Sequence, residues 1–307
     1  MRKANRIAFG ETLVELAKEN PNILVVDADV AKSTGTLTFK EAHPDKFINV
    51  GIAEQNMVGV AAGLATCGKI PFAVTFGVFA SMRAVEQVRN SVCYTKLNVK
   101  IVGTHGGLET GQDGGTHQAI EDIAIIRSLP NIQLFVPSTP NQTVFLTKVA
   151  ASINGPVYLR FGKDPTDEFY SSKEEFPIGK SKVLDNGSDI TVIACGNMVH
   201  VAVEAAELLK KDGVHARVID MYSLKPIDEE EIIKAAKETA GIITIEDHTI
   251  IGGLGGGVCE VTATSHPAKV IRIGLQDRFG RSGDSKSLHI LYGLTAENIV
   301  KAAKSIC

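Results

Sequence analysis

Short apolar runs alternate with segments of helical periodicity along most of this 307-residue chain. Strands separated by helices predict a parallel sheet that is covered by helices on both faces. We therefore expect the first part of the chain to form a doubly wound α/β domain with a mostly parallel, six-stranded sheet. The predicted strands are 23–29, 47–51, 71–76, 99–103, 132–138 and 156–162.

A second, smaller α/β unit is expected in the last part of the chain. It is preceded by the polar segment 163–177, which has no hydrophobic periodicity and is typical of an interdomain linker. We divide the chain into a first domain at 1–165, a linker at 166–178 and a carboxyl-terminal domain at 179–307. The predicted strands of the second domain are 189–196, 215–223, 241–248 and 268–275, with helices at 200–211 and 228–239.

Composition and charge argue against several classes of protein. The net charge of −3 and the lack of Lys/Arg runs make a nucleic-acid partner unexpected. No apolar run approaches the roughly 20 residues that span a bilayer, and the first residues lack the hydrophobic core of a signal peptide. Five scattered cysteines without a C-x-x-C pair indicate reduced thiols. We expect a cytoplasmic protein without membrane contact.

One carboxylate lies in an otherwise apolar and glycine-rich stretch. Residues 49–63 read NVGIAEQNMVGVAAG, and the apolar spacing over 52–67 predicts a helix with Glu54 in its first turn. Two interpretations are open. The glutamate either interacts with the free N–H groups and the dipole of the helix, or it is a buried carboxylate held ready to share a proton with a ligand nitrogen.

The glycine-rich segment 104–118, THGGLETGQDGGTHQ, follows a predicted strand and carries His105, Asp113 and His117. Open α/β sheets bind ligands at the carboxyl ends of their strands, and glycines let the backbone approach a ligand closely. We expect this segment to form a wall of the active site. A solvated loop and a metal site remain open, although the spacing matches no metal-ligand signature.

Phe76 and Phe79 are expected at the end of another strand, one loop away from Glu54. Two phenylalanines are more often core residues than a ligand platform, but beside a buried carboxylate they could enclose a planar heteroaromatic ring. Donors suited to a phosphate stand at other loop positions. These donors are Arg2, Ser33, His105 and Arg160.

A second glycine-rich junction lies at 242–257, IITIEDHTIIGGLGGG. A strand followed by glycines is the general appearance of a dinucleotide site, but the glycines miss the G-x-G-x-x-G spacing. The pattern therefore favours a tight strand-to-helix turn.

Four motifs occur in the order and spacing of a known family. GIAEQNM, TFGVFASM, THGGLETGQDGGTHQ and YLRFGKDP resemble the pyrimidine-binding half of transketolase, and the chain after about residue 178 resembles the carboxyl-terminal domain of that family. The resemblance extends over the whole chain. It implies a thiamine-diphosphate enzyme that transfers a two-carbon ketol unit between ketose and aldose phosphates.

The resemblance also implies roles at the cofactor. Glu54 matches the glutamate that bonds the aminopyrimidine ring and promotes loss of the thiazolium proton, so that the cofactor becomes the nucleophile. Phe76, Phe79, Met82 and Asp29 match residues that line the pocket of that ring. Met82 stands where an aromatic residue is usual in the family.

Roles at the substrate follow from the same resemblance. His117 and Asp113 match groups that contact the donor's hydroxyls, and we expect His117 to join Glu54 as a catalytic residue. Gly115 replaces a usual proline in this segment. The residues that match the sugar-phosphate contacts are His105, Arg160, Arg2 and Ser33.

The motif that holds Mg²⁺ in this family, GDG followed by an asparagine, does not occur in the sequence. Because the chain begins just before the segment that opens the pyrimidine-binding domain, it resembles one subunit of a split transketolase. We expect no metal ligand in this chain. A separate amino-terminal subunit should bind Mg²⁺ and the diphosphate, and this chain should form a homodimer within a heterotetramer.

Three alternatives remain. The beta subunit of a 2-oxo-acid dehydrogenase has a similar length and an AEQ-type segment but lacks the DGGTH loop. Deoxyxylulose-phosphate synthase shares a DG-x-TH loop but lacks a histidine that matches His105. The third alternative is a non-catalytic α/β assembly module in which Glu54 merely interacts with its helix.

Overall fold

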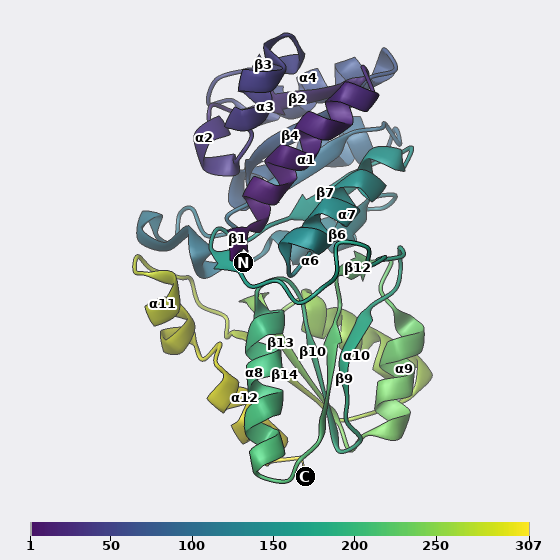
Figure 1. The fold of residues 1–307 in the computed structure, drawn as a ribbon, viewed down its shortest axis with the longest axis vertical. Helices are drawn as coiled ribbons and strands as arrows, with labels where there is room; N and C mark the ends of the chain where they lie inside the picture. Colours follow the sequence, from purple (N-terminus) through teal and green to yellow (C-terminus); the bar gives the residue numbers. More distant parts are fainter. Residues whose placement is uncertain (1, 307) are drawn as a thin grey trace.

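The computed structural model describes residues 2–306, which form two α/β halves stacked along the long axis (Figure 1). The amino-terminal half, in purple and blue, lies at the top, and the carboxyl-terminal half, in green and yellow, lies below it. Near the middle, β1 (Lys3–Ala4) pairs with β8 (Pro165–Thr166) in a two-stranded antiparallel sheet. The beginning of the first half is therefore tied to the segment that leads into the second.

The first half is built on a seven-stranded sheet with the order β12-β6-β7-β5-β4-β2-β3. Six strands are those expected from the sequence, and each is parallel to its neighbours among the six. The seventh, β12 (Ser223–Lys225), comes from the second half and pairs antiparallel with β6, so the sheet is one strand larger than predicted. The six are β2 (Ile23–Asp27), β3 (Phe47–Asn49), β4 (Ile70–Phe76), β5 (Lys100–Thr104), β6 (Gln133–Phe135) and β7 (Val157–Arg160).

Helices cover both faces of this sheet. The helical segments are α1 (Asn5–Glu19), α2 (Ala31–Thr34), α3 (Leu37–Ala42), η1 (Pro44–Lys46), α4 (Glu54–Thr66), η2 (Phe79–Arg83), α5 (Val85–Gln87), η3 (Val88–Cys93), η4 (Leu108–Asp113), α6 (Asp122–Ser128) and α7 (Pro140–Ser152). Phe72 of β4 packs in the same cluster as Phe9 of α1 and Leu146 of α7. Its neighbour Ala73 joins Met57 of α4 in another cluster. Successive residues of a strand thus pack against helices on opposite faces of the sheet, which explains why the strands are continuous apolar runs in the sequence.

The second half has a five-stranded sheet with the order β14-β13-β10-β11-β9, in which only the edge strand β9 is antiparallel. The helices α8 and α12 pack on one face of it, and α9 and α10 pack on the other. The elements are β9 (Lys182–Asn186), β10 (Ile190–Ala194), α8 (Met198–Lys211), β11 (Ala216–Asp220), α9 (Glu229–Glu238), β13 (Ile242–Thr249), α10 (Leu254–Ser265), β14 (Val270–Leu275), α11 (Ser285–Tyr292) and α12 (Ala296–Ala303).

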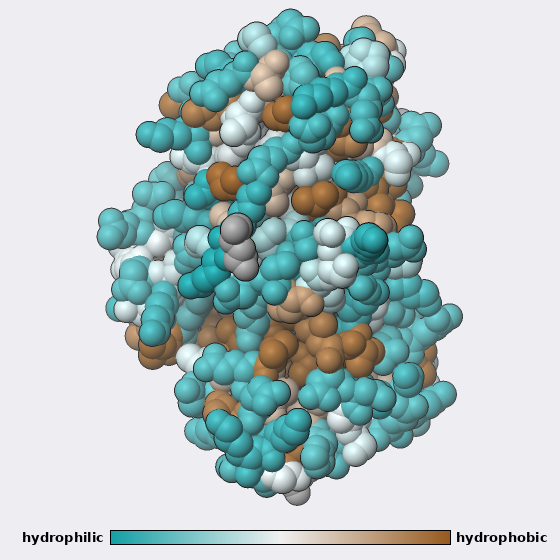
Figure 2. Space-filling model, in the orientation of Figure 1, coloured by the Kyte–Doolittle hydropathy of each residue, from teal (hydrophilic) through white to brown (hydrophobic). Residues whose placement is uncertain are grey.

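One of the hydrophobic clusters is shared by the two halves. Leu134 and Tyr158 of the first sheet belong to the same buried cluster as Ile193 and Ile219 of the second. The outer surface is mostly hydrophilic on the face shown, with hydrophobic side chains gathered in the lower half (Figure 2). Within residues 2–306, no helix is both long and apolar enough to cross a bilayer.

The junction between β13 and α10 explains the second glycine-rich segment. The buried Glu246 carboxylate accepts hydrogen bonds from the backbone N–H groups of Leu254 and Gly255, at 2.6 and 2.8 Å. A Cβ atom on Gly253 would lie 2.0 Å from Glu246 Oε2, so a side chain there would displace the carboxylate. The glycines serve a tight turn around a buried helix cap.

Candidate active site

The candidate site lies along the carboxyl edge of the first sheet, where β2, β4 and β5 run parallel and side by side. Phe76 is the last residue of β4, and His105 follows directly after β5. Glu54 is the first residue of α4 and is only 3% exposed. Parallel strands bring these separate segments to the same edge, which is where open α/β sheets bind ligands.

The Glu54 carboxylate accepts a hydrogen bond from Arg83, a residue that the sequence analysis did not single out. Arg83 Nη1 donates to Glu54 Oε2 at 2.8 Å, and the guanidinium carbon of Arg83 lies 4.1 Å from the centre of the Phe79 ring. Phe79 and Arg83 are the first and last residues of η2, a single π-helical turn, and such turns are frequent at functional sites. Their positions on one side of this turn let the arginine reach over the ring.

Four aromatic rings lie next to one another at this point, and we call the rings of Phe76, Phe79, His105 and His117 the aromatic wall. The Phe76 and Phe79 rings are nearly parallel, with centroids 6.0 Å apart and an interplanar angle of 12°. His105 lies 4.1 Å from Phe76, and His117 meets Phe79 edge-on at 5.4 Å. The structure therefore brings together five residues that the sequence predicted for the site: Glu54, Phe76, Phe79, His105 and His117.

The 104–118 segment is folded back on itself rather than extended into solvent. Thr110 Oγ1 lies 3.1 Å from the carbonyl oxygen of His105 and 3.0 Å from that of His117, so one hydroxyl links the two histidine positions. Gly107 has a φ of 72°, and a Cβ atom on it would lie 2.2 Å from the Asp247 carboxylate. This glycine allows the segment to lie directly on the second half of the molecule.

His105 has a strained backbone and a neutral ring. Its φ is +59°, a left-handed conformation that costs a non-glycine residue on the order of 1 kcal/mol and often occurs at functional sites. Burial, with the nearby charges of Arg6 and Lys163, lowers the pKa of His105 to about 3. A neutral imidazole at ordinary pH can both donate and accept hydrogen bonds.

Arg6 and Lys163 were not singled out from the sequence, yet they lie close to the expected substrate residues. Arg6 Nη1 donates to the carbonyl oxygen of Ser33 at 3.0 Å, and Arg6 Nε donates to that of Lys163 at 3.3 Å. Both side chains are half-buried. Arg6 therefore lies beside Ser33, and the charges of Arg6 and Lys163 both act on the His105 imidazole. Lys163 stands in the YLRFGKDP motif, but the resemblance gave it no role, and Arg6 stands outside the four motifs.

Arg160 takes a different place from the one expected. It is 5% exposed, and its Nε donates to both Asp122 carboxylate oxygens at 2.8 and 3.1 Å. Its Nη2 donates to the carbonyl oxygens of Ala119 and Asp247 at 3.1 and 2.9 Å. These bonds commit the guanidinium to joining the loop and the two halves. Nε and Nη2 are therefore committed to this junction, and within the described residues Nη1 is the guanidinium nitrogen left for a ligand, so a phosphate contact of Arg160 stays a prediction.

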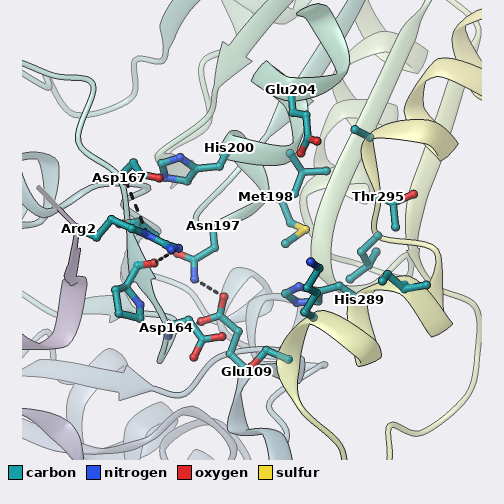
Figure 3. Close-up of a pocket in the computed structure, with 18 of the residues that line it drawn as sticks. Arg2, Glu109, Asp164, Asp167, Asn197, Met198, His200, Glu204, His289 and Thr295 are labelled. Atoms are coloured by element: carbon teal, nitrogen blue, oxygen red, sulfur yellow. Dashed lines mark hydrogen bonds and ion pairs between the residues drawn. The ribbon is translucent and has the colours of Figure 1, made fainter. Parts of the chain in front are cut away.

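Arg2 also lies outside the aromatic wall. Its Nη2 donates to the carbonyl oxygen of Pro165 at 3.0 Å, and its Nε is 3.7 Å from the Asp167 carboxylate. Arg2 lines a cavity of about 390 Å³ between the two halves, and Figure 3 shows Asn197 beside it. Arg2 thus lies apart from the aromatic rings, and the phosphate role expected for it stays a prediction.

The remaining predicted residues are exposed at the rim. Asp29 has a φ of +67° and accepts a hydrogen bond from Asn49 Nδ2 at 2.8 Å. Met82 is 36% exposed and lies within η2, next to Arg83. Asp113 and Ser33 are exposed at the surface of their loops. None of these side chains packs into a closed pocket within this chain, so the site is an open wall.

A separate polar cluster joins the halves at the interdomain cavity (Figure 3). Glu109, Asp247 and His289 offer ligand atoms within 4.8 Å of one another. Glu109 Oε2 already accepts the N–H groups of Lys163 and Asp164, and Asp247 accepts that of Leu108. His289 Nε2 lies 3.2 Å from Asp247 Oδ2. These contacts explain the cluster as an interdomain polar network.

The observed wall fits one end of thiamine diphosphate. Arg83 shows that a planar group carrying N–H donors can bond Glu54 while it lies over Phe79, and an aminopyrimidine ring has the same two properties. Glu54, Phe76 and Phe79 would hold that ring. For the diphosphate, this wall offers no comparable cluster of acidic metal ligands within the described residues. The fit is therefore to the pyrimidine half.

Comparison with known proteins gives the class of this chain. The model of the transketolase pyrimidine-binding domain matches residues 2–167, and that of the transketolase C-terminal domain matches residues 179–299. The chain belongs to the transketolase family. Within that family it corresponds to the carboxyl-terminal section of a split enzyme. It is 49% identical to a putative transketolase C-terminal section of Methanocaldococcus jannaschii, over 97% of this chain and 95% of the relative.

Other relatives agree with this assignment. A subunit of the apulose-4-phosphate transketolase of Phocaeicola vulgatus is 40% identical, over 98% of this chain and 96% of the relative. A solved structure described as a split-gene transketolase, inactive beta4 tetramer, superposes with a TM-score of 0.90 at 49% identity, and the match covers 99% of this chain and 97% of the other. The family expected from the sequence motifs, and the two-domain α/β fold, are thus confirmed.

Proposed function

We propose that this chain is the subunit of a split transketolase that binds the aminopyrimidine half of thiamine diphosphate and part of the sugar substrate. The observation that carries the proposal is the buried Glu54 carboxylate beside the Phe76–Phe79 pair, in a chain that belongs to the transketolase family. The reaction is transfer of a two-carbon ketol unit between ketose and aldose phosphates. Bound thiamine diphosphate supplies the carbon nucleophile for this transfer.

Two residues are assigned to proton transfer. Glu54 would bond a ring nitrogen of the cofactor and move a proton there, which its burial favours because competing water is excluded. His117 has its Nδ1 atom 2.9 Å from Thr116 Oγ1, and this contact fixes the ring orientation. His117 and Asp113 would bond the hydroxyl groups of the donor sugar, and Asp29 and Met82 would line the rim of the ring pocket.

The anionic end of the substrate is assigned to the group around His105. Arg6 and Lys163 would supply charge, and His105 and Ser33 would supply neutral hydrogen bonds. Two relatives are named for sugars with an anionic group, namely apulose 4-phosphate and 6-deoxy-6-sulfo-D-fructose. We assign Arg160 and Arg2 to the architecture of the interdomain region instead.

A second subunit is required by this proposal. The amino-terminal transketolase subunit would bind Mg²⁺ and the diphosphate, and the active site would form where the two subunits meet. Two relatives are described as transketolase subunits, and the split-gene tetramer is described as inactive. We propose that this chain pairs with a second copy of itself within a heterotetramer and works in the cytoplasm on pentose-phosphate sugars.

The test is reconstitution. Transfer from xylulose 5-phosphate to ribose 5-phosphate is measured with Mg²⁺ and thiamine diphosphate, for each subunit alone and for both together. Activity only in the mixture is expected. Full activity from this chain alone would contradict the requirement for a partner. Decarboxylation of pyruvate by the mixture would favour a deoxyxylulose-phosphate synthase or a 2-oxo-acid dehydrogenase, and absence of cofactor binding would favour an assembly module.

A further inference from the structure

We propose that Arg83 is a placeholder for the aminopyrimidine ring: in the partner-free chain its guanidinium fills the place of the ring between Glu54 and Phe79, and it leaves when the cofactor binds. The inference rests on the proposed function, because it concerns the same wall. It adds a residue that governs how readily the wall accepts its cofactor.

The first argument is that Arg83 makes both contacts that the ring would need. Its guanidinium is planar and carries N–H donors, one of which bonds Glu54 Oε2 at 2.8 Å. The same group lies 4.1 Å from the centre of the Phe79 ring. A second planar group cannot take this carboxylate oxygen and this ring face while Arg83 holds them.

The second argument is that Arg83 is free to leave. Its side chain is 46% exposed, whereas that of Glu54 is 3% exposed. Within residues 2–306, its guanidinium makes no hydrogen bond other than the one to Glu54. The pair therefore consists of a fixed carboxylate and an arginine with a path to solvent. Arg160 is the opposite case, because Asp122, Ala119 and Asp247 hold it in a buried position.

The third argument concerns the cost of an empty wall. Without Arg83, a buried carboxylate would face the opening without a charged partner, which is unfavourable. Arg83 relieves this cost while the partner subunit is absent. The same stabilisation opposes cofactor binding, since only the fraction of molecules with Arg83 displaced is competent to bind.

The experiment compares cofactor affinity in the reconstituted complex by equilibrium dialysis of thiamine diphosphate with Mg²⁺. Arg83→Gln keeps most of the side-chain length but removes the charge, so we expect the dissociation constant to fall by about tenfold. Arg83→Lys keeps the charge but loses the planar group, and a smaller decrease is expected. Arg89→Gln is the matched control, because Arg89 is an exposed arginine of η3 that bonds only Asn90 in the described structure.

A second measurement uses this chain without its partner. NMR titration with the isolated aminopyrimidine fragment of thiamine should give tighter binding to Arg83→Gln than to the unmodified chain. Weaker binding of either probe to Arg83→Gln would overturn the proposal and make Arg83 a permanent part of the cofactor wall. An unchanged affinity would overturn it as well. Failure of the unmodified complex to bind thiamine diphosphate would instead contradict the proposed function.

Discussion

Two buried glutamates stand at glycine-rich strand-to-helix junctions of this chain, and they have opposite surroundings. Glu246 accepts two backbone N–H groups of α10, at 2.6 and 2.8 Å, and is completely buried. Glu54 is 3% exposed, receives no such bond from α4, and is held only by the movable Arg83 within the described structure. Burial alone therefore does not mark a functional carboxylate. What distinguishes Glu54 is that its own helix leaves the carboxylate available to a ligand.

The strongest test of this comparison is Glu54→Gln in the reconstituted complex. We expect turnover to fall by at least about 10²-fold, the usual scale for losing a proton-transfer group. Glutamine is nearly isosteric but cannot hold the proton that the cofactor requires. Steady-state kinetics measures the effect, and thermal unfolding should show an unchanged midpoint. Activity close to that of the unmodified complex would reduce Glu54 to a helix-end residue.

The same substitution at the other junction should act on stability. Glu246→Gln leaves one of the two N–H groups of α10 facing an amide nitrogen, so we expect a loss of about 2 kcal/mol in the free energy of unfolding. Urea unfolding at fixed protein concentration measures it. The folded fraction should keep its activity. A catalytic defect without loss of stability would remove the distinction between the two glutamates.

The cations around the site can be compared in the same way. Arg6→Ala should raise the KM for phosphorylated donors by about tenfold, the value of roughly one charge-assisted hydrogen bond. The KM for the unphosphorylated donor hydroxypyruvate should hardly change. Arg160→Ala is the contrasting variant, because loss of the buried pair with Asp122 should lower stability and affect both donors alike. A phosphate-selective effect of Arg160→Ala would restore the role first expected for it.

A smaller, pH-dependent effect is expected at the interdomain network. Burial lowers the pKa of His289, but the Asp247 carboxylate outweighs it and raises that pKa from 6.5 to about 9. A raised folded-state pKa means that the stabilisation is complete below about pH 6.5 and is lost as pH rises through about 9. Urea unfolding at several pH values should show this loss for the unmodified chain.

His289→Gln is the control for that titration, because it removes the ionisable ring and should flatten the dependence above about pH 6.5. The buried carboxyl group of Glu109 titrates in a lower pH range than His289. Its burial, with the charge of Asp164, raises its pKa to about 7 from 4.5, so its ionisation lowers stability as pH rises between these values. An unchanged slope of stability against pH above about pH 6.5 in His289→Gln would assign the loss of stability to another group.

The fold was largely predictable because its information is local. Each strand of the first sheet is a continuous apolar run, and hydrophobic spacing marks helices such as α4 (Glu54–Thr66), for which 52–67 was expected. The strand β12 (Ser223–Lys225) was missed because it is short and is stabilised by pairing with β6, far away in the sequence. Pairing between distant segments leaves little trace in either segment alone.

The candidate site, like the fold, was predictable from the sequence only in part. The motifs around Glu54, Phe76, His105 and His117 identified the family and the aromatic wall, since the chemistry of these residue types is visible in the sequence. Only the tertiary structure decided which partners the arginines have. It buried Arg160 against Asp122 and placed Arg6 beside Ser33 and Arg83 on Glu54. A guanidinium looks the same in any sequence, and its partners, which come from distant segments, determine whether it holds the fold together or remains available to a ligand.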